Sequence, residues 1–210
     1  MNTTTDQPSQ DAIIDTAMTV IAEHGLSHAA WKELAAQSGC TAHALRGRIG
    51  DLPGAVLKFL DRIDRQVLSE EAGFTDEDSV KDRLFDLLMR RLDGLAAHRQ
   101  TMVAVSQEMR RNPCLAALIG GRELRALSWY LEEAGVSTKG PFGMIRTKGL
   151  GLVWTHAFTV WLGDDSDDFA KTMAVLDKDL TRADQAASWI KPHRGRSTGA
   201  DEGVEAVSPL

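Results

Sequence analysis

Apolar side chains recur at helical spacing along nearly the whole chain, and this pattern constrains the fold more than any other feature. Ile13, Ala17 and Ile21 repeat in steps of four, and Leu84 and Leu88 begin a similar stripe later in the chain. No stretch alternates Val, Ile or Thr for long enough to predict a strand. Glycines, an Asn-Pro pair and acidic breaks divide the pattern into segments. We therefore predict an all-α fold of about nine helices.

The stretch from Trp31 to Ile49 has the spacing of a helix-turn-helix. Ala35 is small enough for two helices to cross closely, and Gly39, four residues later, suits a turn with positive φ. Thr41 is placed to cap the N-terminus of the second helix. A generic corner between two helices is the alternative interpretation, but the combined spacing favours a helix-turn-helix.

The first sixty residues resemble the TetR family of bacterial transcriptional regulators. The helix from Ile13 to Gly25, with its Ala-Glu-His-Gly ending, looks like that family's opening. Leu34-Ala35-x-x-x-Gly39 and Ala44-Leu45-x-x-x-Ile49 match the central pattern of its helix-turn-helix. The resemblance at this level of specificity covers residues 13–60.

The resemblance implies an organisation for the rest of the chain. A helix-turn-helix DNA-binding headpiece is expected over residues 10–64, and a helical ligand-binding and dimerisation domain over residues 65–190. Residues 191–210, rich in Gly, Ser and Pro, are expected to form a disordered tail. The implied function is a homodimeric repressor that binds a pseudo-palindromic double-stranded DNA operator and releases it when a small apolar effector binds.

The DNA-facing residues are expected on the second helix of the motif and close to it. They are Lys32, Thr41, Ala42, His43, Arg46, Gly47 and Arg48. Residues 1–64 hold five cations and eight acids, and the whole chain has a net charge of −6. Because non-specific DNA affinity comes largely from phosphate neutralisation, these cations must cluster on the docking face. Arg46 is the preferred phosphate contact, with an ion pair to Glu33 or Asp51 as the alternative.

The last two predicted helices suggest how two copies associate. Leu150 to Leu162 is apolar on all sides, so it must be buried on all sides. The segment 167–190 carries one apolar stripe at steps of four and three, which is typical of a bundle seam. Together they predict a four-helix dimer interface, or alternatively two helices of a monomer core. The interface candidates are Leu150, Val153, Trp161, Met173, Leu176 and Leu180.

A second group of apolar residues could line a ligand pocket in the body. They are Met102, Met109, Trp129, Trp154 and Phe158, although such residues at helical spacing are more often plain core. The segment 161–177 also resembles the C-terminal region of TetR-fold lipid-binding accessory proteins of ubiquinone biosynthesis. That resemblance implies an alternative function, an isoprenoid-binding protein that does not bind DNA.

No sequence signature of catalysis or of a resident cofactor is present. The chain lacks a nucleophile elbow, a phosphate loop and a nucleotide fingerprint, so we expect neither an enzyme nor a cofactor. Cys40 and Cys114 are too far apart for a metal-ligand pair. The longest uncharged run, residues 149–163, would extend about 22 Å as a helix, against about 30 Å for a bilayer core. We expect a cytoplasmic protein without stable membrane insertion.

Overall fold

The computed structural model describes residues 8–70, 73–75, 77–166 and 168–190, and every regular element in these ranges is a helix. The prediction of an all-α fold is therefore confirmed, and the predicted tail at residues 191–210 lies outside the described ranges. The nine helices of this part of the chain are α1 (Gln10–His24), α2 (His28–Ser38), α3 (Ala42–Ile49), α4 (Leu52–Ser69), α5 (Val80–Ala96), α6 (Arg99–Arg111), α7 (Pro113–Glu133), α8 (Gly140–Leu162) and α9 (Ala170–Ile190).

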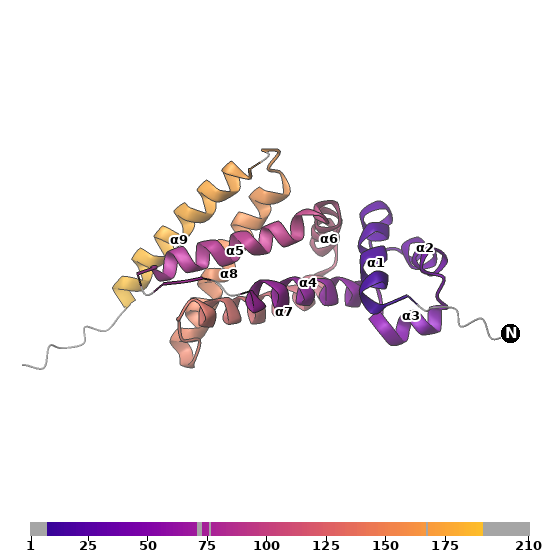
Figure 1. Ribbon diagram of the computed structural model, residues 1–210, viewed down its shortest axis with the longest axis horizontal. Helices are drawn as coiled ribbons and strands as arrows, with labels where there is room; N and C mark the ends of the chain where they lie inside the picture. The colour runs from indigo at the N-terminus through magenta and orange to yellow at the C-terminus, as the bar shows by residue number, and fades with distance from the viewer. Residues whose placement is uncertain (1–7, 71–72, 76, 167, 191–210) are drawn as a thin grey trace, which may run out of the picture.

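Helices α1, α2 and α3 gather at one end of an elongated molecule, and we call them, with the start of α4, the headpiece (Figure 1). The helix-turn-helix forms as its local signals predict. The Thr41 hydroxyl accepts a hydrogen bond from the backbone N–H of Ala44 at 3.2 Å and caps α3. Gly39 takes the left-handed conformation, with φ of 64°, between α2 and α3. Leu34 of α2 and Leu45 of α3 are fully buried in the core of the headpiece, where both helices pack against α1.

Helix α4 is the main connection between the headpiece and the body, which comprises α5 to α9 (Figure 1). It begins at an Asp51 cap and packs against α1 and α3 near its start, and against α5 and α7 further along. A second connection joins α6 to α1, because the buried Thr101 hydroxyl donates to the carbonyl of Met18 at 2.7 Å. Two helices of the molecule, α4 and α6, therefore join the headpiece to the body.

Helices α8 and α9 pack along each other, and α5 packs against both. The prediction of a dimer interface is wrong for five of its side chains, because this packing buries them inside the chain itself: Leu150, Val153, Trp161, Leu176 and Leu180. The sixth, Met173, is partly buried. For these side chains the alternative of a monomer core is correct. Two other apolar side chains of α8, Ile145 and Leu152, are exposed instead.

Among the helices described, none combines the length and the apolar character needed to cross a membrane.

Candidate nucleic-acid interface and ligand cavity

The surface of α3 presents most of the residues that the sequence singled out for DNA contact. Thr41, Ala42, His43, Arg46 and Gly47 are all exposed on α3 or at its cap, and Lys32 is exposed on α2. The structure thus places these six predicted residues on two adjacent helices at the end of the molecule.

Arg46 has no partner among the side chains that the structure describes. The two acids that offered an alternative partner are engaged elsewhere. Glu33 accepts a hydrogen bond from the Gln37 side chain at 2.9 Å, and Asp51 accepts one from the Gly54 backbone N–H at 2.7 Å. The Arg46 guanidinium is therefore available to an anionic partner.

Arg48 is placed differently from Arg46. Its side chain is half-buried, and Nη1 donates to the carbonyl of Pro8, just before α1. The backbone carbonyl of Arg48 also accepts a hydrogen bond from the Gln10 side chain at 3.3 Å. Arg48 thus connects the end of α3 to the start of α1. Its side chain holds α3 in position and does not project from the exposed α3 surface.

Four of the eight acids of the headpiece sequence form ion pairs with arginines away from α3. Asp11 and Asp15 of α1 both pair with Arg62 of α4. Asp61 and Asp64, also on α4, pair with arginines of the body. A headpiece sequence with a net negative charge can therefore present exposed cations on α2 and α3.

The body contains a largely apolar cavity of about 820 Å³, which we call the body cavity. Its wall is formed by side chains of α4, α5, α6, α7 and α8. Four of the five predicted pocket residues line it: Met102, Met109, Trp154 and Phe158. The fifth, Trp129, lies on α7 outside this wall with 43% of its surface exposed, so its placement in the pocket was wrong. The volume is in the range of sites for drug-sized ligands.

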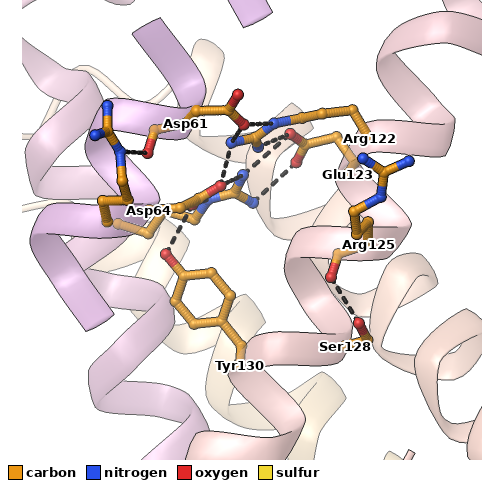
Figure 2. Close-up of polar contacts among 9 residues, drawn as sticks. Asp61, Asp64, Arg122, Glu123, Arg125, Ser128 and Tyr130 are labelled. Carbon is orange, nitrogen blue, oxygen red and sulfur yellow. Dashed lines mark hydrogen bonds and ion pairs between the residues drawn. The ribbon is translucent and has the colours of Figure 1, made fainter. Parts of the chain in front are cut away.

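An ionic network that is buried except at Asp61 crosses from α4 to α5 and α7 beside this cavity (Figure 2). It consists of Asp61, Asp64, Arg91, Arg122, Glu123 and Tyr130. Arg91 is fully buried; its Nε donates to Asp64 Oδ1 at 2.7 Å, and its two terminal nitrogens donate to the Glu123 carboxylate at 2.8 and 3.0 Å. The ring of Trp154 covers the guanidinium of Arg91, with 4.4 Å between its central carbon and the ring centroid.

Arg122 and Tyr130 make the remaining contacts of the network with the same carboxylates. Arg122 donates to Asp61 at 2.8 Å and to Glu123 Oε1 at 2.8 Å, and it also pairs with Asp64. The Tyr130 hydroxyl donates to Asp64 Oδ1 at 2.8 Å. Two acids of α4 are thus held by arginines that also hold Glu123 on the cavity wall.

Protonation states in the network follow from burial and from charge pairing. Burial alone would raise the pKa of Glu123, but attraction to Arg91 and hydrogen bonds from Arg91 and Arg122 outweigh it and lower that pKa. The pKa of Arg91 is raised: its burial acts against the charged form, but the charges of Glu123 and Asp64 outweigh it. Burial raises the pKa of Tyr130. At neutral pH Glu123 and Arg91 are therefore ionised, and Tyr130 is a neutral donor.

The sequence contained an overlooked signal for this network. Arg91 lies three residues after Leu88 and four before Leu95, within the apolar stripe of α5. Asp64 lies in the same way between Leu60 and Val67 on the buried side of α4. Charged residues on an apolar stripe predict buried, paired charges.

Comparisons with known proteins give a consistent picture of the fold. A TetR transcriptional regulator from Nitrosomonas europaea ATCC 19718 matches with a TM-score of 0.68 at 22% identity, over 85% of this chain and 99% of that one. A TetR transcriptional regulator from Rhodococcus sp. RHA1 matches with a TM-score of 0.57 at 17% identity, over 84% and 94% of the two chains. NalD, the secondary repressor of the MexAB-OprM multidrug efflux pump in Pseudomonas aeruginosa, matches with a TM-score of 0.53 at 18% identity, over 83% and 96%.

No family model and no curated protein matches the sequence. The structural matches extend over the headpiece and the body together, and they cover nearly the full length of each matched protein. This chain therefore has the fold of the TetR-family transcriptional regulators.

Proposed function

We propose that this protein is a cytoplasmic, ligand-responsive transcriptional regulator that binds double-stranded DNA as a homodimer and acts as a repressor. One observation carries the proposal: the exposed α3 surface with its unpaired Arg46 is joined through α4, the next helix of the chain, to the wall of an apolar cavity. The TetR-type fold supports the same function.

DNA contact is assigned to α3 and the start of α2. The second helix of a helix-turn-helix enters the major groove, and its N-terminal residues contact base edges. In this chain those residues are Thr41, Ala42 and His43. Gly47 brings the backbone close to DNA, and the side chains of Arg46 and Lys32 face phosphates. Arg48 holds α3 in place through Pro8.

Dimerisation is assigned to the exposed apolar side chains of α8, in place of the buried ones predicted from sequence. Leu152 has 76% of its surface exposed, and Phe142, Met144 and Ile145 are each more than half exposed. Exposed apolar groups in such number on one helix mark a surface that a partner covers. Two copies joined there would present two α3 helices to successive turns of a pseudo-palindromic duplex.

Ligand response is assigned to the body cavity. Val56 and Leu60 of α4 form part of its wall, and the ionic network fixes α4 to α5 and α7 directly beside it. An apolar effector that fills the cavity would favour those arrangements of α4 that fit its shape. It shifts the population of DNA-binding arrangements only by its difference in affinity between them.

The test is selection of bound duplexes from a random-sequence pool by the full-length protein at low salt. We expect enrichment of one sequence with two-fold symmetry, whose half-sites are centred about one helical turn apart. Recovery of duplexes with no common sequence, or no recovery above a protein-free control, would contradict the proposal.

The second candidate is a TetR-fold lipid-binding protein that does not bind DNA, and the volume and apolar wall of the body cavity favour it. Native mass spectrometry of gently purified protein separates the two functions. An isoprenoid lipid bound to the chain, together with a failed duplex selection, would support this second candidate. An enriched duplex would exclude it.

A further inference from the structure

The body cavity has one carboxylate in its wall, that of Glu123, counting the residues that the structure describes. Oε1 of this group accepts hydrogen bonds from Arg91 at 3.0 Å and from Arg122 at 2.8 Å, whereas Oε2 accepts only one, from Arg91 at 2.8 Å. A carboxylate oxygen can accept two hydrogen bonds. Oε2 therefore has one acceptor position left, and 18% of the Glu123 side chain is exposed.

The acceptor itself is an ionised group. The buried part of the ionic network contains two carboxylates, Asp64 and Glu123, and two guanidiniums, whereas the third carboxylate, Asp61, has 51% of its side chain exposed. The lowered pKa of Glu123 keeps its carboxylate charged at neutral pH. The other charged side chains of the cavity wall, Arg110 and Lys148, are exposed. A ligand group that reaches Glu123 therefore meets an ionised acceptor in largely apolar surroundings.

We propose that the body cavity selects an apolar molecule that carries a single hydrogen-bond donor group, such as an alcohol or an amine, and places this group on Oε2 of Glu123. The hydrocarbon part lies against Trp154, Phe158 and Leu127. A carboxylic acid of equal chain length binds more weakly, because its anion faces the ionised carboxylate of Glu123 and has no donor to offer. This inference rests on the proposed function, since both place a ligand in the same cavity.

The test compares three ten-carbon probes on the full-length protein at pH 7: 1-decanol, decylamine and decanoate. Each is titrated against the fluorescent dye N-phenyl-1-naphthylamine, an apolar aromatic amine with one N–H donor. We expect the alcohol and the amine to displace the dye at concentrations at least tenfold lower than decanoate. Equal displacement by all three probes, or stronger displacement by decanoate, would overturn the proposal.

The variant Glu123→Gln removes the charge and keeps the shape of the side chain. We expect the advantage of decanol and decylamine over decanoate to fall to threefold or less in this variant. An advantage as large as in the wild type would show that Glu123 does not select the ligand.

Two neighbouring glycines of α7 provide a matched pair that locates the dye and leaves the network intact. Gly120 lines the cavity and Gly121 is exposed outside it, and a Cβ at either position meets nothing within 4 Å. We expect Gly120→Leu to weaken dye binding at least tenfold and Gly121→Leu to leave it unchanged. Equal dye binding by both variants would place the dye outside the cavity and overturn the proposal.

These outcomes separate this inference from the function it rests on. If Glu123→Gln unfolds, the wild-type ranking of the three probes and the glycine pair still decide the question. If the glycine pair places the dye in the cavity but decanoate displaces it as well as the alcohol and the amine do, the proposed ligand class is refuted. The cavity then remains a candidate effector site. Absence of any dye binding refutes the ligand class and removes the support for ligand response. Duplex selection tests DNA binding independently of both.

Discussion

Replacing Arg91 with Met tests whether the ionic network holds α4 to the body. Met retains a long apolar side chain beneath Trp154, but the substitution removes the guanidinium that bonds Asp64 and Glu123. Asp64 is 1% exposed, so its charge would remain buried with only Arg122 and Tyr130 as partners. Loss of one partner from a buried ion pair costs about 3–5 kcal/mol. For a chain of this length that corresponds to a fall in Tm of about 6–20 °C.

The loss of stability in Arg91→Met should depend on pH in a definite direction. In the wild type the pKa of Glu123 is lowered, so its contribution to the free energy of unfolding is fully present above the unfolded value of 4.5. That contribution is lost as pH falls through the lower folded value. Without Arg91, burial of Glu123 is less well offset and its folded pKa rises, so acid relieves the destabilisation. The deficit of Arg91→Met should therefore be smaller at pH 4 than at pH 7.

The assay is urea unfolding followed by circular dichroism at the two pH values. Arg90→Met is the matched control, because Arg90 lies next to Arg91 on α5, is partly exposed, and pairs with Asp86 one turn away. We expect the control to change the free energy of unfolding by about 0.5 kcal/mol or less. A deficit of less than about 1 kcal/mol for Arg91→Met at pH 7 would refute this reasoning, because the expected loss is larger. A deficit that grows as the pH is lowered would refute it as well.

Two further predictions concern the surfaces. Arg46→Ala should weaken binding to the selected duplex and reduce the slope of log affinity against log salt by about one. Arg182→Ala, which replaces an exposed arginine of α9, should change neither the affinity nor the slope. Fluorescence anisotropy at several salt concentrations measures both quantities, and identical slopes for the two variants would remove Arg46 from the interface. Met144→Glu should convert the dimer to a folded monomer, because that side chain is exposed in the single chain and lies outside the body cavity. Light scattering with circular dichroism measures this, and an unchanged mass would place the interface elsewhere.

The local features of the headpiece could be predicted because each depends on a few neighbouring residues. Thr41 caps α3 through a bond to a residue three positions away, and Gly39 takes its conformation from the turn alone. The second helix begins earlier than its apolar residues suggested, at His28, because the Ser27 hydroxyl caps it there.

The arrangement of the body could not be predicted in the same way. Helix α8 is apolar on all sides, so its sequence does not tell which side meets α9 and which side stays exposed. The sequence therefore led to Leu150 and Trp161 as interface residues, although both are buried in the chain. The position of Arg91 in an apolar stripe did signal a buried charge. Its partners depend on how α4, α5 and α7 cross, which spacing along one helix does not contain.

The central claim is that DNA binds the α3 surface, and hydrogen exchange followed by mass spectrometry tests it most directly. The full-length protein is compared with and without the selected duplex. We predict slower exchange over residues 41–50 and at the start of α2, with no direct protection of α9. Unchanged exchange across α2 and α3, with protection confined to the body, would contradict the claim.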